Sequence, residues 1–241
     1  MWKVKGMGVL VRLIAFVKSW HKRMYRLLSH ILSPLRFLYY WLKSSQRPND
    51  LHLMRPIFWP LGLILLLLDV LGIPEIYESF MDLIKWRSRP LSDVERSQCQ
   101  QIFGDQIAWS RVRIDSKAIA GPKQWRIAYV SFYTINSWGE LELPILIHEM
   151  VHIWQFEKFG SLYIPLALQA QLSKAGYDYG GEKALMKKQE QTFYYAFNFE
   201  QQAEIVEDFY RSKKGLPLQW SRRGAIANHW LSYWVRKSFI S

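Results

Sequence analysis

Hydrophobic and polar positions follow different periods in different parts of the chain. From residue 7 to 42, apolar residues recur at helical spacing with Lys and Arg between them, and Pro34 predicts a break. Residues 57–73 then contain a single charge, Asp69, and the stretch 61–68 within them is apolar on every face. A helix without a polar face is either deeply buried or in contact with lipid. The pattern therefore predicts basic amphipathic helices followed by a hydrophobic helix of about 57–73, a candidate for a transmembrane or membrane-inserted helix.

The pattern changes near Pro90, where we place a domain boundary between residues 1–90 and 91–241. Ser92 and Glu95 form a capping-box pattern, which predicts a helix over 93–103. Alternating apolar and polar residues, rich in β-branched and aromatic types, predict two strands and then a series of helices. The expected strands are 109–115 and 124–135, with a turn at 120–123, and the expected helices begin at Pro144 and then cover 162–173, 200–213 and 222–237. The fold class expected is α+β, mainly helical.

Charge is distributed unevenly along the 241 residues. The net charge is +12, and residues 1–55 hold 11 Lys or Arg against one acid, Asp50. These bases alternate with aliphatic residues, Trp and Tyr, as in helices that lie on anionic lipid, although a basic helix pair packed on the domain has the same composition. We expect a membrane-associated protein, in bacteria at the inner membrane, with lipid as a partner and no nucleic acid. The sequence leaves open the side of the membrane on which the domain lies.

The start of the chain has some features of a signal peptide, but Arg12 and Lys18 interrupt its apolar region and no small-residue cleavage site follows. We therefore expect no cleavage. Cys99 is the only cysteine, so the sequence predicts neither a disulfide framework nor a cysteine zinc site.

The stretch 142–156, ELPILIHEMVHIWQF, contains a His-Glu-x-x-His motif. On a helix, His148 and His152 lie one turn apart on the same face, so both imidazoles can reach one metal ion. Glu149 lies beside them, where it can take a proton from a metal-bound water, which is the arrangement for metal-assisted hydrolysis. The alternative is a pair of histidines satisfied by ordinary hydrogen bonds, although unpaired imidazoles are unfavourable on so apolar a helix.

A zinc site needs a third protein ligand, and the segment FNFEQQAEIVEDF offers Glu200, Glu204 and Asp208, spaced four apart. Taken alone, such a row is equally typical of a solvated acidic face. Beside a His-Glu-x-x-His helix, it favours a metal ligand and a carboxylate that supports a histidine.

The two motifs together resemble those of the gluzincin metallopeptidases, which carry His-Glu-x-x-His on one helix and Glu-x-x-x-Asp or a close variant on a later one. More narrowly, residues 91–211 are similar to small bacterial zincin-like proteins found near type VI secretion spike (Vgr) and Rhs elements, in LIHEMVHIWQ, YDY and FNFEQQAEIVEDFY. The resemblance implies a zincin-like domain with one zinc ion, Glu200 as third ligand, and Glu204 or Asp208 behind a histidine. Because Glu204 stands where the pattern has Asp, and Glu204 with Asp208 also fits it, Glu204 remains an alternative third ligand.

The resemblance also implies a substrate-binding edge strand before the motif helix, in the place of residues 133–138, and a Tyr or His that stabilises the oxyanion. Tyr163, Tyr177 and Tyr179 are candidates for that Tyr. We expect a zinc metallopeptidase that cleaves a peptide or protein, with Glu149 as general base. The alternatives are a non-catalytic zinc-binding accessory protein of a secretion or toxin system, and a membrane-surface anchor with an inert domain. The sequence does not predict the oligomeric state.

Overall fold

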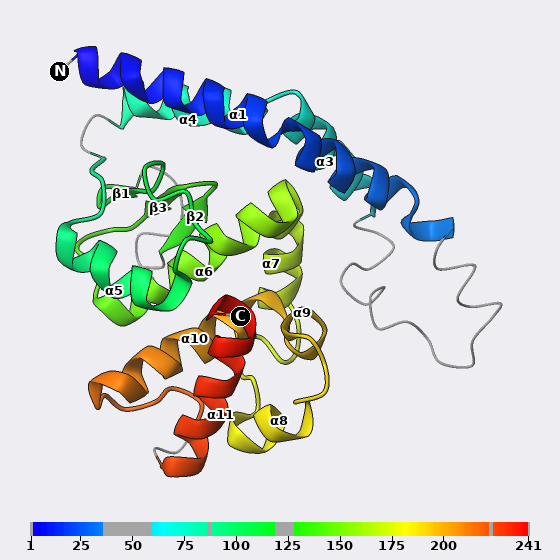
Figure 1. Cartoon of the computed structure of the whole chain (residues 1–241), viewed down its shortest axis with the longest axis vertical. Helices are drawn as coiled ribbons and strands as arrows, with labels where there is room; N and C mark the ends of the chain where they lie inside the picture. The colour runs from blue at the N-terminus through cyan, green and yellow to red at the C-terminus, as the bar shows by residue number, and fades with distance from the viewer. Residues whose placement is uncertain (1, 36–58, 86–87, 119–127, 222–223, 241) are drawn as a thin grey trace.

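The structure is a computed structural model that describes residues 2–35, 59–85, 88–118, 128–221 and 224–240. It is mainly helical with one small three-stranded sheet, which confirms the expected α+β, mainly helical class. Three helices form an elongated layer along one side of a globular body (Figure 1). The layer, which we call the N-terminal layer, consists of α1 (Trp2–Ile31), α3 (Trp59–Val70) and α4 (Ile73–Ile84).

The body contains the sheet and the remaining helices. Its elements are α5 (Asp93–Phe103), β1 (Arg113–Asp115), β2 (Tyr129–Ser131), β3 (Thr134–Asn136), α6 (Leu143–Phe159), the 3₁₀ turn η4 (Gly160–Leu162), α7 (Tyr163–Gln171), α8 (Gly181–Lys187), α9 (Phe193–Ala196), α10 (Phe199–Lys214), α11 (Ala225–Val235) and the π-helical turn η5 (Arg236–Ile240). The sequence patterns predicted α5, α6, α7, α10 and α11, but not the short helices α8 and α9. The division at Pro90 stays a prediction.

The hydrophobic segment 57–73 forms the 12-residue helix α3 where the structure describes it, and residues 57–58 lie outside the described residues. The chain bends at Gly72, which has φ 75°, and α4 follows with Pro74 in its first turn. Among the described residues, no single helix has the length and hydropathy to cross a bilayer, but the bent pair of α3 and the first ten residues of α4, at 69°, meets both criteria jointly. Membrane crossing stays a prediction.

The sheet has the strand order β1-β3-β2. β1 pairs with β3 in parallel, and β2 pairs with β3 in antiparallel, with Val130 opposite Ile135. The prediction of one continuous strand over 124–135 is wrong, because the chain turns at Phe132, whose φ is 57°. Sequence patterns place such a conformation at Gly or Asn. Here the Phe132 ring packs edge-on against Tyr77 and at a tilt against Phe156, contacts that offset the strain. The expected turn at 120–123 lies outside the described residues.

Two helices, α6 and α10, form the centre of the body. Pro144 lies in the first turn of α6, and Gly160 ends the helix with φ 63°. Asn198 and Gln201 form a capping box at the start of α10, and Gly215 ends it in the left-handed conformation. The core residues Leu146, Met150, Ile153, Ala203, Ile205 and Val206 are fully buried. This packing brings the polar residues of the two helices face to face.

Candidate metal centre

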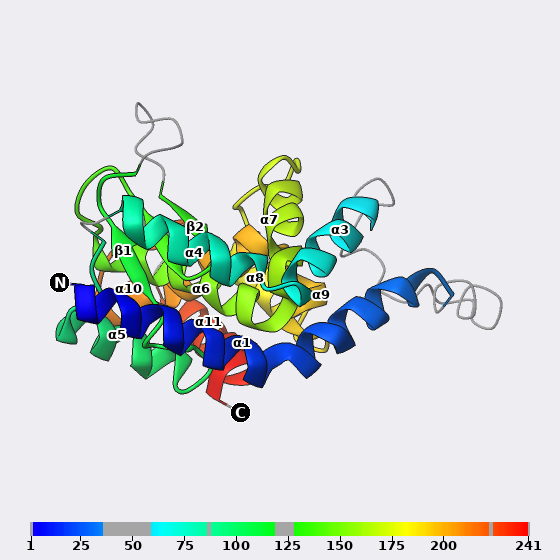
Figure 2. The same cartoon turned by 90° about the horizontal axis from the view of Figure 1, so that it is seen from above.

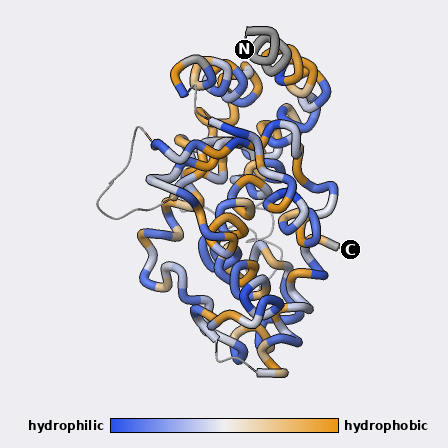
Figure 3. Tube along the Cα trace, turned by 90° about the vertical axis from the view of Figure 1, so that its left-hand side faces the viewer, coloured by the Kyte–Doolittle hydropathy of each residue, from blue (hydrophilic) through white to orange (hydrophobic). Residues whose placement is uncertain are grey.

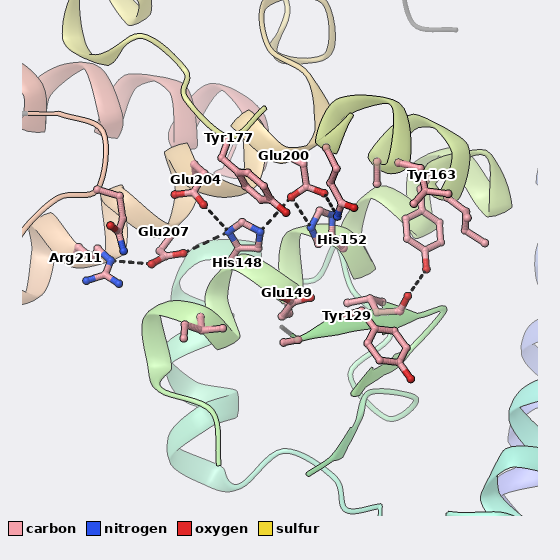
Figure 4. A pocket seen from close by; sticks show the side chains of 18 residues that line it. Tyr129, His148, Glu149, His152, Tyr163, Tyr177, Glu200, Glu204, Glu207 and Arg211 are labelled. Carbon is pink, nitrogen blue, oxygen red and sulfur yellow. Dashed lines mark hydrogen bonds and ion pairs between the residues drawn. The ribbon is translucent and has the colours of Figure 1, made fainter. Parts of the chain in front are cut away.

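Three sequence-predicted residues, His148, His152 and Glu200, converge where α6 faces α10 (Figure 4). Glu200 Oε2 lies 3.4 Å from His148 Nε2 and 3.5 Å from His152 Nε2. All three residues are buried, and they line a cavity of about 450 Å³. The convergence arises from helix geometry, because the two histidines lie one turn apart and Glu200 stands in the first turn of the facing helix.

These separations fit a metal ion. Tetrahedral zinc with ligand bonds of about 2.0–2.1 Å keeps its ligand atoms about 3.3–3.4 Å apart, and the measured distances of 3.4 and 3.5 Å are close to that value. The donors, two imidazole nitrogens and one carboxylate oxygen, are a set that zinc accepts. The buried histidines and glutamates could therefore bind a metal ion.

Hydrogen bonds behind His152 fix the orientation of its ring. Its Nδ1 lies 2.8 Å from Gln155 Oε1. The amide nitrogen of Gln155 donates to the Phe199 carbonyl and to Gln202 Oε1, so its oxygen is the atom that accepts from His152. This arrangement places the proton of a neutral His152 on Nδ1 and leaves Nε2 free to bind a metal.

Two carboxylates lie behind His148. Glu204 Oε1 is 3.4 Å and Glu207 Oε2 is 3.3 Å from His148 Nδ1, the ring nitrogen turned away from Glu200. Glu204 also accepts from Trp220 Nε1 at 2.8 Å, and Glu207 accepts from Arg211 Nε at 2.7 Å. Glu200, and not the alternative Glu204, therefore lies against both imidazoles. His148 Nδ1, Glu204 and Glu207 are also close enough together to hold an ion.

The sequence analysis expected Glu204 or Asp208 to lie behind a histidine. Asp208 does not lie there. It accepts from the Tyr179 hydroxyl and from the backbone N–H groups of Gln219 and Trp220. The reason is helical periodicity: at about 100° per residue, a residue eight positions after Glu200 has turned by about 80°, whereas the seventh, Glu207, has turned by about 20°. Sequence analysis missed Glu207, although this spacing was available to identify it.

Burial and pairing shift the pKa values of the cluster in opposite directions. Burial lowers the pKa of His148, but hydrogen bonds to Glu200 and Glu207 outweigh it and hold that pKa well above its usual range. Burial raises the pKa of Glu200, but the two imidazoles hold it well below its usual range. Burial also raises the pKa of Glu204 to about 7. Without a metal, protonated imidazole balances the carboxylates, and a bound cation would take over that role by displacing protons.

Glu149 is a buried acid with one oxygen that accepts no hydrogen bond from the described residues. Its side chain lines the cavity, and Oε2 is buried without a hydrogen-bond partner among the described residues. Burial raises the pKa of Glu149. A buried carboxylate oxygen without a partner is unfavourable in a purely structural role, since it loses its hydration without compensation.

The three candidate tyrosines have different positions. Tyr177 lines the cavity with its ring 6.2 Å from that of His148 (Figure 4). Burial, reinforced by Glu200 and Glu149, raises the pKa of Tyr177, which keeps its hydroxyl as a donor. Tyr163 also lines the cavity, but its hydroxyl donates to the Val130 carbonyl. Tyr179 is buried against Asp208. Tyr177 is therefore the tyrosine with its ring beside the imidazoles.

The strand that borders the cavity is not the one expected from residues 133–138. β3, which comes from that segment, is the central strand, because the hairpin at Phe132 places β2 at the edge. Tyr129 and Val130 of β2 line the cavity. Sequence analysis could not identify this strand, since the turn that creates it has no turn residue.

Comparisons with family models, curated proteins and solved structures find no significant match to this chain. The functional argument therefore rests on the site itself.

Proposed function

We propose that the body is a zincin-like zinc metallopeptidase domain that hydrolyses peptide bonds and holds one zinc ion by His148, His152 and Glu200. The observation that supports this most directly is the convergence of two imidazole Nε2 atoms on one Glu200 oxygen at tetrahedral spacing. Bound zinc supplies a Lewis acid for the substrate carbonyl and a more acidic water. The resemblance in the two helix motifs points to the same chemistry.

The chain's own residues would do the remaining work. Glu149 would accept the proton of the attacking water on its unpartnered oxygen and return it to the leaving amine. The Tyr177 hydroxyl would donate to the oxygen that gains charge, a role supported by the position of its ring beside His148 in the cavity. Ile145, Ile164 and Leu168 line the same cavity and offer an apolar surface for a substrate side chain.

The deciding experiment compares wild type with Glu149→Gln, both loaded with zinc, on a diverse peptide library. We expect the variant to keep about one zinc per chain and to lose at least about 10²-fold in kcat/KM, since it cannot accept a proton. Glu142→Gln is the matched control, because this exposed residue at the start of the same helix does not line the cavity and should leave activity unchanged. Retained turnover in Glu149→Gln would exclude the general-base role.

A second measurement separates the metal site from the chemistry. His148→Ala should reduce bound zinc from about one per chain to nearly none by metal analysis. If the wild type holds zinc and cleaves no peptide in the library, the non-catalytic accessory function expected as the alternative would replace the peptidase. If the wild type binds no zinc at all, the proposed metal site is wrong.

A further inference from the structure

The N-terminal layer has its polarity reversed with respect to an ordinary surface helix. Several of its charged residues are buried between the helices or against the body, namely Arg12, Arg23, Asp69, Glu75 and Glu78. Its large apolar residues face away from the body. Among the described residues, 20 of the 29 exposed large hydrophobic side chains belong to residues 9–35 and 59–84, and nine belong to the rest of the chain. Monomeric soluble proteins rarely expose contiguous apolar patches of this kind.

The exposed residues form continuous stripes. On α1, Leu10, Leu13, Ile14 and Val17 recur three or four apart, which places them on one helix face. On α4, Ile73, Ile76, Phe80 and Ile84 do the same. Figure 2 shows α1 alongside α3 and α4 in front of the rest of the body, and in Figure 3 the helices at the top alternate hydrophobic with hydrophilic residues. We call the exposed apolar residues of α1, α3 and α4 together the outer face of the layer.

Buried contacts fasten the layer to the body at both ends of α3. Asp69, near the end of α3, accepts from the backbone N–H and the hydroxyl of Ser161. Near its start, Gly62 packs so closely against Leu162 that an added Cβ would lie 2.8 Å from it. α3 therefore lies lengthwise against η4.

Similar contacts fasten α4. Glu75 and Glu78 near its start pair with Arg111 at 3.0 and 3.2 Å, and Glu78 also accepts from the Tyr133 backbone N–H. Just after its end, the Lys85 ammonium lies 3.3 Å from Asp115. Because both halves of the bent pair lie along the same body, neither can cross a bilayer without breaking these buried pairs.

Cations flank the outer face. Lys18 is exposed on α1 on the side of the helix next to its apolar stripe, and Trp20 is exposed two residues later. Lys22 and Tyr25 are also exposed, on the side of α1 that borders a cavity against the body. Apolar residues edged by Lys, Trp and Tyr match the acyl boundary and anionic headgroups of a bilayer, where aromatic rings with one polar end are favoured. A dimer interface would gain nothing from this fringe of like charge.

We propose that the outer face of α1, α3 and α4 inserts into one leaflet of an anionic lipid bilayer, so that the layer is a monotopic platform and not a membrane span. The acids that would be unfavourable in lipid are directed toward the body, and the bend at Gly72 keeps α3 and α4 on the same side. This docking does not depend on the metal site, so His148→Ala should bind vesicles as wild type does.

The first test is co-sedimentation of the full chain with vesicles of phosphatidylcholine, with and without phosphatidylglycerol. We expect wild type to bind the anionic vesicles more tightly, and Leu13→Gln/Val17→Gln and Ile76→Gln/Phe80→Gln each to bind at least about tenfold more weakly. The matched control is Val94→Gln/Leu172→Gln, since both residues are as exposed on the body, at 65% and 83%. The single variant Phe80→Gln serves if a double variant does not fold.

Three outcomes would overturn the proposal: no binding to anionic vesicles, equal loss in the control, or a stable dimer that the outer-face variants dissociate while vesicles do not compete for it. The last would assign the face to a second copy of the chain.

The second test asks whether the protein inserts into one leaflet or spans both. Cys99 is buried and burial raises its pKa to about 12, so it gives an unreactive background for Pro34→Cys, an exposed position before α3, and Glu140→Cys, an exposed position in the body. With the protein added outside sealed vesicles, an impermeant maleimide should label both positions equally. Protection of one position until the vesicles are lysed would show a span and exclude the monotopic arrangement.

Discussion

The N-terminal layer and the α6–α10 helix pair both bury charged side chains, but they satisfy them differently. In the layer, Glu75 and Glu78 meet Arg23, Arg12 and Arg111 in direct ion pairs. In the helix pair, carboxylates surround two imidazoles beside a cavity, and one oxygen of Glu149 accepts no hydrogen bond from the part of the chain that the structure describes. A buried charge with direct partners holds elements together, whereas buried donors that converge beside a cavity can receive a ligand.

The largest expected effect tests the buried ion pairs of the N-terminal layer. Glu75→Ala leaves the buried guanidinium of Arg23 without its carboxylate, and removing one partner of a buried ion pair typically costs about 3–5 kcal/mol. Chemical denaturation should show that loss in the free energy of unfolding. Arg89→Ala is the control, because its pair with Glu95 is exposed on the Arg89 side and should contribute about 0–1 kcal/mol. Equal effects at both sites would mean that burial does not distinguish these pairs.

The next effect tests the close contact between layer and body. Gly160 has φ 63°, and an added Cβ would overlap the Asp69 carboxylate that binds Ser161. Gly104 is a matched control: it also ends a helix, has φ 51°, and has no atoms near its Cβ position. Both Ala variants carry backbone strain, so we expect Gly160→Ala to be about 1–3 kcal/mol less stable than Gly104→Ala because of the contact alone. Equal losses would show that the layer moves away without a penalty.

A smaller effect tests the carboxylates that surround the imidazoles between α6 and α10. Glu207 lies behind His148 Nδ1 and is not one of the three proposed ligands. Loss of such a supporting carboxylate typically weakens metal binding about 10–100-fold, so Glu207→Gln should show that change in a zinc titration against a chelator. Glu190→Gln, at an exposed position outside the cavity, is the control. If Glu207→Gln bound zinc as wild type does, Glu204 alone would be sufficient to orient His148.

Some of this comparison could be predicted from sequence. The His-Glu-x-x-His spacing and the capping box at Ser92 are local patterns, and the structure brings the motif histidines to Glu200 and forms the predicted helix from Asp93. The inward charges of α4 were not predicted, because a sequence does not show which face of an amphipathic helix meets the body. The reversal depends on Arg111, a residue of the body that supplies the partner for Glu75.

The smallest effect concerns an exposed pair and its dependence on pH. The hydrogen bond from Arg89, reinforced by the Ser92 backbone, lowers the pKa of Glu95 from 4.5 to about 2. A depressed pKa stabilises the fold above the unfolded value of about 4.5, and that contribution is lost as pH falls toward about 2. Because Glu95 is only partly buried, we expect no more than about 1 kcal/mol.

Glu95→Gln isolates this contribution, since Gln at the same position can still form the capping box with Ser92. The difference in unfolding free energy between wild type and Glu95→Gln should therefore be largest near pH 7 and shrink between about pH 4.5 and pH 3. A difference that stayed constant over that range would mean that Glu95 stabilises α5 through geometry and not through charge. The exposed pair would then differ from the buried pairs of the N-terminal layer in kind, and not only in its exposure to water.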